Sequence, residues 1–419
     1  MTDTAEMKTT DPVNETPRFT GPAQEIAPDV FIFPEFVNSY AVRTQAGLLL
    51  IDPGRRIAAP RVHAAIRSWS DLPVHTCVYT HGHLDHAFGL GPFLAAGDRP
   101  LIVAQENLPK RFHRYRLTQG YNEIINQRQF GDDLIRFGVD QFDWPTLTFR
   151  DALEQTIGDV EVRYQAEKGE TDDHCFVWLP QKKYLFCGDL IIWRAPNCGN
   201  PQKVQRYPVE WADALERMAA LDAQWLFPGH GPVVHGEDNV RRVLKETAQY
   251  LRHIIRQVLE RLNAGQSHAE ILEAVTSDPE LSRRPYLLEL YDHPQFIVRN
   301  LLRLWGGWWN GVAADLLPAG IADLASEIAH LAGGVDALIK RGRELLAQGN
   351  AAMAAHLAEW ASRAAPADRS AQEFKRDVYE FCVAHTDNLM AQGVYRYAMN
   401  EAHDALGEGR RLRTGPRTL

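Results

Sequence analysis

"VYTHGHLDHAFG", residues 78–89, places three histidines and an aspartate within six consecutive positions. The motif follows "VHTCVYTH", whose β-branched character predicts a buried strand. With 16 histidines in 419 residues, chance rarely produces such a cluster. Histidine nitrogens and carboxylate oxygens suit zinc. His81 and His83 can turn towards one ion, and Asp85 and His86 towards a second. The motif therefore indicates half of a two-metal site.

The other half is expected from loops beside later strands. "GETDDHCFVWLP" contributes His174 just before a predicted strand, "YLFCGDLI" contributes Asp189 just after one, and "WLFPGHGP" contributes His230 after a third. Taken alone, each of these residues is as well explained by a turn or a polar loop. Together with the first motif, they predict a two-metal centre.

Charge, hydrophobic content and cysteine usage limit the classes of function that the sequence allows. The net charge is −9 and 45% of residues are hydrophobic, which provides a sizeable core and no basic surface for a nucleic-acid backbone. No stretch approaches the roughly 20 apolar residues of a membrane span. Five widely spaced cysteines and a polar N-terminus that does not read as a secretory signal favour reduced thiols in the cytoplasm. We therefore expect a cytoplasmic protein without nucleic-acid or membrane partners.

The pattern divides the chain into three parts. Residues 1–22 are predicted to be a disordered tail, 23–238 a catalytic α/β domain and 239–419 a helical domain. Strands alternate with helices in the α/β part, as in a layered sandwich, with a mostly helical insertion at 105–140. Beyond Gly236 the sequence predicts helices almost throughout. The later ones are expected at 267–276, 294–305, 321–347, 350–364 and 370–391.

The ordered set of motifs over about 25–236 resembles the metallo-β-lactamase fold superfamily, in its two-metal branch typified by hydroxyacylglutathione hydrolase. The resemblance implies an α/β fold, an αββα sandwich, here followed by an all-α dimerisation domain. It implies that His81, His83 and His174 hold a first zinc ion, that Asp85, His86 and His230 hold a second, and that Asp189 bridges them. Iron or manganese are alternative metals. Asp52 corresponds to an aspartate that supports the ligands from behind.

The helical half is similar to the dimerisation domain of type III, zinc-dependent alkyl sulfatases. The similarity rests on "LLRLWGGWWNGVAADLLPA", residues 301–319, and implies a homodimer in which Trp308 and Trp309 line the substrate pocket or the dimer interface. "WRAPNCGNPQKVQRYPVEWADAL", 193–215, occupies the place of the sulfate-binding segment of those enzymes. The candidate substrate contacts are therefore Arg194, Asn197, Asn200, Lys203 and Arg206. Alkyl sulfatases have a glutamate where this sequence has His174.

The implied chemistry is hydrolysis of an ester-like bond, for which an alkyl or aryl sulfate ester is one candidate. Two ions roughly 3.5–4 Å apart lower the pKa of a bridging water towards about 7. The resulting bridging hydroxide attacks the ester, and Asp85 is the predicted catalytic residue that orients it and handles its proton. Alternatives are a lactone, a carboxylic or thio-ester, or an activated ether as substrate. An iron-dependent oxidoreductase and a non-catalytic dimerisation scaffold are rival classes.

Overall fold

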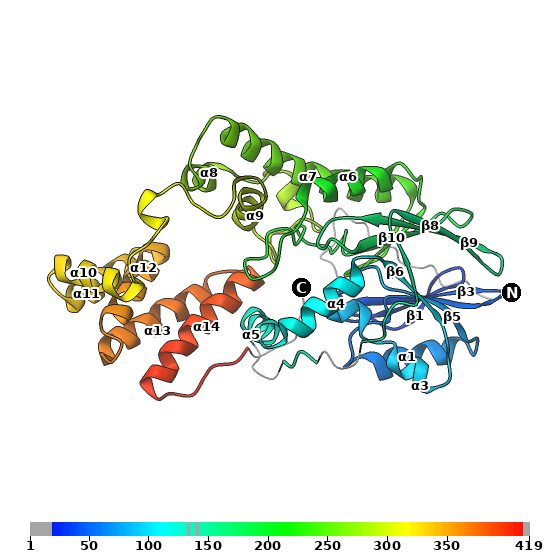
Figure 1. Cartoon of the computed structure of the whole chain (residues 1–419), viewed down its shortest axis with the longest axis horizontal. Coiled ribbons are helices and arrows are strands. Elements are labelled where there is room, and N and C mark those ends of the chain that lie inside the picture. The colour runs from blue at the N-terminus through cyan, green and yellow to red at the C-terminus, as the bar shows by residue number, and fades with distance from the viewer. Residues whose placement is uncertain (1–18, 132–134, 139–141, 414–419) are drawn as a thin grey trace.

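The structure is a computed structural model that describes residues 19–131, 135–138 and 142–413. Two β-sheets lie face to face. Helices α6 (Pro208–Ala219) and α7 (Glu237–Asn263) cover one outer face, and α1 (Ala59–Trp69) and α3 (Gly91–Ala95) cover the other (Figure 1). This αββα order, followed by a helical region, confirms the predicted fold class.

The first sheet has seven strands in chain order, antiparallel from β1 to β4 and parallel from β4 to β7. They are β1 (Gln24–Ala27), β2 (Val30–Pro34), β3 (Asn38–Thr44), β4 (Gly47–Ile51), β5 (Val74–Val78), β6 (Leu101–Gln105) and β7 (Leu147–Phe149). The second sheet has the order β13-β12-β11-β10-β9-β8, and only its β11–β12 pair is parallel. Its strands are β8 (Ala152–Ile157), β9 (Val160–Glu167), β10 (His174–Leu179), β11 (Tyr184–Gly188), β12 (Trp225–Pro228) and β13 (Val234–His235).

The main core fills the space between the sheets. Val78 and Val103 from the first sheet belong to the same buried cluster as Phe186 and Phe227 from the second. Both sheets are therefore buried on their inner faces, and helices cover their outer faces. Because both faces are buried, the central strands are continuous apolar runs. The strand ends beyond this core are free to carry polar loops.

The remaining helices fall into an insertion and a C-terminal series. They are α2 (Leu84–Ala87), α4 (Leu108–Leu117), α5 (Gln119–Phe130), α8 (His268–Ala274), α9 (Pro294–Gly306), α10 (Ile321–Ala332), α11 (Val335–Ala347), α12 (Ala351–Ala364), α13 (Arg369–Ala384) and α14 (Leu389–Leu406), with short 3-10 turns at Leu281–Arg283 and Ala313–Asp315. The single helix predicted at 321–347 is wrong. Gly333 and Gly334 have φ angles of 91° and 120°, so the chain turns there between α10 and α11.

The predicted helix at 370–391 is also divided. Between α13 and α14 the chain leaves the helical conformation, and the side chain of Asn388 accepts a hydrogen bond from the Ala391 N–H to begin α14. An asparagine cap satisfies a backbone donor that the helix itself cannot. Helical periodicity alone did not reveal this restart.

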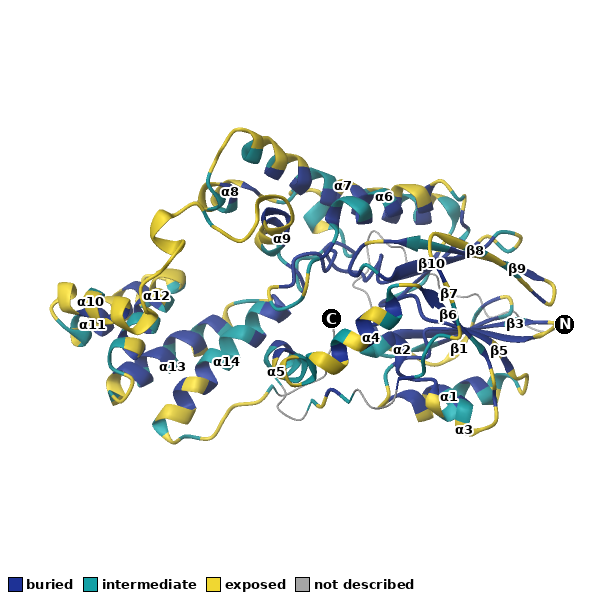
Figure 2. Cartoon of the chain, viewed as in Figure 1, coloured by how far each residue is buried: buried dark blue, intermediate teal, exposed yellow. Residues whose placement is uncertain are grey.

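The helical half packs in two ways. Helices α7 and α9 share a buried cluster with the second sheet and α6, and Leu389 and Met390 at the start of α14 also belong to it. Helices α10–α13 and the later part of α14 form a separate cluster. Figure 2 shows that most residues of the two sheets are buried, whereas many residues around α10 are exposed. The predicted division after residue 238 falls in the first turn of α7. The division into domains stays a prediction.

The predicted N-terminal tail extends into the described residues. Residues 1–18 lie outside them, but Phe19 is buried, and the Arg194 guanidinium carbon lies 4.5 Å from the centre of its ring. Phe19 is therefore part of the packed structure. Over the ranges that the structure describes, no helix has both the length and the apolar character needed to cross a membrane.

Candidate metal centre

Loops at one edge of the sandwich bring the predicted ligands together. One loop and the short helix α2 follow β5, and two further loops follow the parallel strands β11 and β12. The carboxyl ends of these strands meet at this edge, so residues far apart in the sequence converge there. The side chains gathered in this way are His81, His83, Asp85, His86, Asp189 and His230.

The first ligand group consists of His81, His83, Glu170 and Asp189, each of which offers one ligand atom within 4.8 Å of the others. His81 Nε2 lies 2.9 Å from His83 Nδ1 and 3.7 Å from Asp189 Oδ2. His83 Nδ1 lies 3.8 Å from Glu170 Oε1. Two nitrogens and two carboxylates around one point form a donor set that suits a divalent transition metal.

The second group consists of Asp85, His86 and His230. His86 Nε2 and His230 Nε2 lie 3.1 Å and 3.3 Å from Asp189 Oδ1, and 3.7 Å and 3.5 Å from Asp85 Oδ2. The two oxygens of Asp189 therefore face different groups. This arrangement is the one that a bridging carboxylate between two ions requires.

Buried atoms without partners support metal binding. Within the described residues, His86 Nε2, Glu170 Oε2 and Asp189 Oδ1 are buried and form no hydrogen bond. His86 Nε2 and Asp189 Oδ1 lie 3.1 Å apart, so one ion could contact both atoms. Unpaired buried polar atoms are rare in proteins. A divalent metal cofactor satisfies all three.

The protonation of the ligands also fits. Burial, reinforced by neighbouring histidines and, around His83, by Arg111 and Arg206, lowers the pKa values of His81 and His83 well below the ordinary range. Both rings are therefore neutral and keep a free lone pair. Burial raises the pKa of Glu170 to about 8, although Arg206 lowers it. A metal ion beside this carboxyl would favour its ionised form, which is the form that binds metal and pairs with Arg206.

Hydrogen bonds and contacts to the Nδ1 atoms orient the two histidines of the second ligand group. Asp52 accepts hydrogen bonds from the Thr80 N–H at 2.8 Å and the Thr80 hydroxyl at 2.7 Å, and its Oδ2 lies 2.8 Å from His86 Nδ1. Asp52 has a φ of 50°, a left-handed conformation that turns the chain at this point. His230 Nδ1 contacts the carbonyl oxygen of Phe36. These contacts leave both Nε2 atoms pointing at the metal positions, which is how outer partners orient ligating histidines.

Glu170, and not the predicted ligand His174, belongs to the first group of close ligand atoms. His174 Nε2 accepts a hydrogen bond from the Asp189 N–H at 3.2 Å, so its lone pair is already used. Its ring stacks on His81, with centroids 4.9 Å apart. His174 therefore positions Asp189 and His81 from the side. The glutamate expected at this ligand position is present four residues earlier, in "GETDDH".

A cavity of about 920 Å³ opens from the metal centre. His83, Asp85 and Glu170 reach its inner end. The insertion helices α4 and α5 line it with the apolar or aromatic side chains of Tyr115, Tyr121, Ile125 and Phe130, and with polar ones. A polar wall faces them and carries four of the predicted substrate contacts, Asn197, Asn200, Lys203 and Arg206. The cavity thus joins the metal centre to both an apolar and a cationic surface.

Three predicted substrate residues lie elsewhere. Arg194 stacks on Phe19 and donates a hydrogen bond to the Trp193 carbonyl at 2.8 Å. Trp308 and Trp309 are 74% and 42% exposed on the segment between α9 and α10, and neither they nor Arg194 line the cavity. Within one chain, therefore, none of the three reaches the substrate position.

Comparison with known families now identifies the fold. A profile described as "Metallo-beta-lactamase superfamily" matches residues 32–230. This part of the chain resembles the metallo-beta-lactamase superfamily. A second profile, "Alkyl sulfatase dimerisation", matches residues 267–405. The chain therefore joins a region similar to that superfamily to a region similar to the alkyl-sulfatase dimerisation domain, the combination that the sequence predicted.

Several alkyl sulfatases are among the proteins that the chain resembles. The chain is 29% identical over 364 residues to a linear primary-alkylsulfatase from a Pseudomonas species, covering 80% of this chain and 68% of that one. It is 24% identical to an (R)-specific secondary-alkylsulfatase from Pseudomonas, covering 85% and 58%. The solved structure of the inverting sec-alkylsulfatase Pisa1 from Pseudomonas superposes with a TM-score of 0.81 at 23% identity over 90% of this chain and 65% of that one. The chain thus spans about two thirds or less of these relatives.

Proposed function

We propose that the chain is a hydrolase of organic sulfate esters that uses two divalent metal ions, adding water to give an alcohol and sulfate. One observation carries this proposal. The two ligand groups open into a cavity that is lined both by cationic side chains, Arg206 and Lys203 among them, and by apolar ones. A sulfate ester has the matching parts, an anionic head and an apolar group. The names of the relatives support the same substrate class.

The metal is proposed to be zinc. His81, His83, Glu170 and Asp189 would hold one ion, and Asp85, His86 and His230 the other, with Asp189 shared. Imidazole and carboxylate donors are common around zinc, while iron and manganese accept similar sets. Bound ions of this kind lower the pKa of water and stabilise charge on an ester oxygen.

Asp85 is the proposed catalytic residue among the protein's own groups. Its carboxylate lies between His86 and His230, and its side chain is 23% exposed towards the cavity. It can therefore accept a hydrogen bond from the attacking water and then its proton. The cavity gives the water and the substrate a common approach to this carboxylate.

The cationic wall is proposed to bind the sulfate head. Arg206 forms an ion pair with Glu170 and donates a hydrogen bond to the Asn197 carbonyl at 2.6 Å, so its guanidinium is fixed. Burial, with the nearby Arg206, lowers the pKa of Lys203 to about 7. A bound sulfate favours the protonated lysine, because an adjacent negative charge stabilises the ammonium form. Lys203 therefore becomes a stronger anion contact when substrate is present.

The protein is also proposed to be a homodimer. Residues 304–324, here termed the apolar segment, contain nine of the large hydrophobic residues that are exposed in the described chain: Leu304, Trp305, Trp308, Trp309, Val312, Leu316, Leu317, Ile321 and Leu324. Such a concentration is rare on a monomer and typical of an interface. The match of residues 267–405 to a dimerisation family supports the same use. A cytoplasmic location stays a prediction.

The test is sulfate release, measured by ion chromatography, from zinc-loaded protein with linear, branched and aromatic sulfate esters. His83→Ala is the matched control, since it removes one ligand and leaves the cavity walls intact. Release from the wild type well above this control is the expected result. Absence of release from all esters, with hydrolysis of a lactone, carboxylic ester or thio-ester, would replace the sulfatase proposal by the esterase alternative. Oxygen uptake by iron-loaded protein would favour the oxidoreductase instead.

A further inference from the structure

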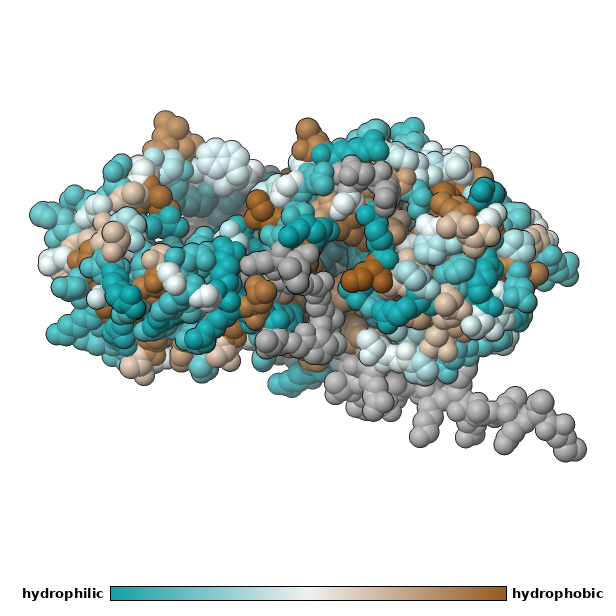
Figure 3. Space-filling view, turned by 90° about the horizontal axis from the view of Figure 1, so that it is seen from below, coloured by the Kyte–Doolittle hydropathy of each residue, from teal (hydrophilic) through white to brown (hydrophobic). Residues whose placement is uncertain are grey.

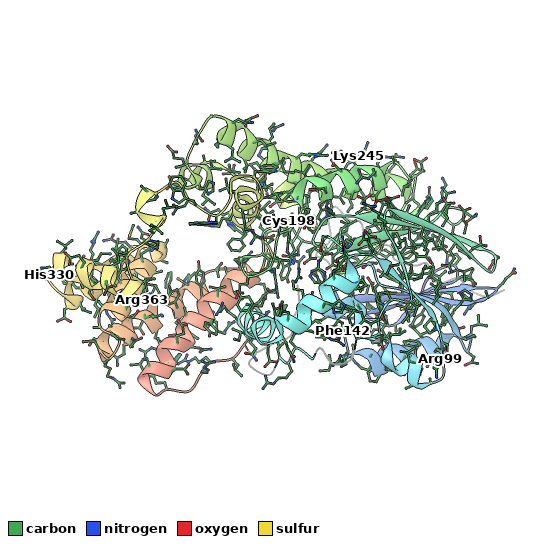
Figure 4. The ribbon with its side chains drawn as sticks, viewed as in Figure 1. Arg99, Phe142, Cys198, Lys245, His330 and Arg363 are labelled. Atoms are coloured by element: carbon green, nitrogen blue, oxygen red, sulfur yellow. The ribbon has the colours of Figure 1, made fainter. Side chains whose placement is uncertain are left out.

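The polar wall of the cavity is attached to the helical half of the chain. This wall is the loop from Ala195 to Arg206. The Ala195 N–H donates a hydrogen bond to the Leu288 carbonyl at 3.1 Å, and the Gly199 N–H donates one to the buried Asp292 carboxylate. Figure 4 shows Cys198, in the same loop, in the middle of the molecule between the sandwich and the C-terminal helices. The loop therefore follows the position of the helical half.

Gly199 fixes how closely the loop and the helical half approach. A Cβ atom at this position would lie 2.1 Å from the Phe296 carbonyl carbon and from the Ile297 nitrogen, at the start of α9. Only glycine allows such contact between two backbones. The wall thus has no freedom to shift towards α9.

Asn300 of α9 holds the other end of the loop. Its side-chain N–H donates a hydrogen bond to the Arg206 carbonyl at 2.9 Å, and its side-chain oxygen accepts one from the Arg206 N–H at 3.3 Å. The same oxygen accepts from Gln205 Nε2 at 3.0 Å and from Arg303 at 2.9 Å. One buried amide therefore pairs with both backbone groups of Arg206, as a neighbouring strand would.

Asparagine at a buried helix position needs an explanation. Asn300 is 6% exposed, and its neighbours in α9, Leu301 and Leu302, belong to the apolar core. Asparagine is a poor helix former, and a buried amide is costly unless its hydrogen bonds are made. A leucine would satisfy the packing of α9 but not the polar groups of Arg206. An asparagine at position 300 is therefore explained by its hydrogen bonds to the loop and not by the packing of α9.

The contacts continue from Arg206 to the metal centre. Arg206 is 3% exposed, and its guanidinium pairs with Glu170, a member of the first ligand group. Asn197, at the other end of the same wall, also donates a hydrogen bond to Glu170 at 2.5 Å. A displaced loop would therefore move both the anion contact and the partner of a metal ligand.

We propose that Asn300 is a positioning residue, through which the dimerisation domain sets Arg206 for the sulfate head of the substrate. The inference rests on the proposed function for its kinetic consequence, but not for the structural link itself. The helical domain then has a second role besides dimerisation, because it builds one wall of the active site of its own chain. Sulfate binding depends on this link directly through Arg206, whereas the chemical step depends on it only through the contacts of Arg206 and Asn197 with Glu170.

The experiment compares Asn300→Leu, Asn300→Asp and Gln372→Ala in the zinc-loaded full chain. Gln372 is the matched control, a buried amide in α13 whose Nε2 donates to the Pro366 carbonyl at 2.9 Å, outside the loop contacts. Hydrogen exchange of residues 197–206 and the KM and kcat for a sulfate ester are measured for each variant. Asn300→Leu is expected to accelerate exchange in this segment roughly tenfold and to raise KM roughly tenfold, with kcat within about twofold.

The conservative variant sharpens the result. Asn300→Asp keeps the acceptor for the Arg206 N–H and loses the donor to its carbonyl, so its exchange rate and KM should fall between the wild type and Asn300→Leu. If Asn300→Leu matches Gln372→Ala in local exchange, the positioning role is overturned. Faster exchange with an unchanged KM overturns the link to substrate binding. If the wild type releases no sulfate, the proposed function fails, while the exchange data still decide whether Asn300 holds the loop.

Discussion

Folded proteins usually bury apolar side chains and expose polar ones, and the metal centre and the apolar segment depart from this rule in opposite directions. In the metal centre, His86, Glu170 and Asp189 bury polar atoms without hydrogen-bond partners. In the apolar segment, Trp308 and Leu317 leave 74% and 90% of their surface exposed. Buried polar groups and exposed apolar patches are the two informative exceptions in a folded protein. Each points to a partner, metal ions in the first case and a second copy of the chain in the second.

Hydrophobic side chains are otherwise sparse on the surface. On the face seen in Figure 3, hydrophilic residues dominate, and hydrophobic ones form small separate patches. The apolar segment contrasts with this pattern, since nine exposed large hydrophobic residues lie within one short stretch of chain. If the comparison holds, changes in one region should affect catalysis and changes in the other should affect assembly.

The largest effect is expected from His83→Ala. Removing this ligand from the first group costs several kcal/mol of transition-state stabilisation, or a loss of about 1000-fold in kcat/KM. The dimer should persist, because His83 lines the cavity and no residue of the apolar segment does. Steady-state sulfate release and sedimentation velocity on the same sample check both parts. A dimer that dissociates with the loss of activity would show that the two regions are not separate.

A smaller loss is expected from Asp52→Ala. The variant keeps all proposed ligands but removes the carboxylate that contacts His86 Nδ1 and accepts from Thr80. Outer partners of this kind change metal affinity by about 10- to 100-fold. Competition with a zinc chelator should show weaker binding at one of two sites. Unchanged zinc affinity at both sites would show that Asp52 does not support metal binding.

Trp308→Ala tests the other region, with the smallest expected effect. Truncating an interface tryptophan costs about 1 kcal/mol or somewhat more, so the dimer dissociation constant should rise roughly fivefold to tenfold. The kcat should change less than about twofold, because Trp308 does not line the cavity of its own chain. Sedimentation equilibrium over a concentration series measures the constant, with the exposed Leu117→Ala on α4 as a control. An unchanged constant would leave the apolar segment without a function.

Much of the metal centre could be predicted because its signal is local. His81, His83, Asp85 and His86 lie in six positions after a strand, and Asp189 and His230 lie at the ends of two others. The ligand prediction and the geometry differ at one place, where His174 and Glu170 lie four residues apart. Sequence alone does not show that β10 begins at His174 or that the Asp189 N–H uses its nitrogen. The glutamate of related enzymes was a signal that pointed to Glu170.

The helical half was less predictable from the sequence. Periodicity located most helices, but aromatic composition cannot tell an exposed Trp308 from one that lines a pocket. Likewise, the charge of Arg194 does not indicate that its guanidinium stacks on Phe19. Asn300 carried no signal, since its role depends on contact with a loop that lies 94 residues earlier in the chain. Such pairings follow from tertiary structure and not from local pattern.

The metal content of two variants tests the central claim most directly. Glu170→Ala and His174→Gln are purified with zinc, and their bound metal is counted by mass spectrometry beside the wild type. The structure predicts two ions per chain in the wild type and in His174→Gln, whose amide can still accept from the Asp189 N–H, and one ion in Glu170→Ala. Two ions in Glu170→Ala together with one in His174→Gln would contradict this ligand set and return His174 to the metal.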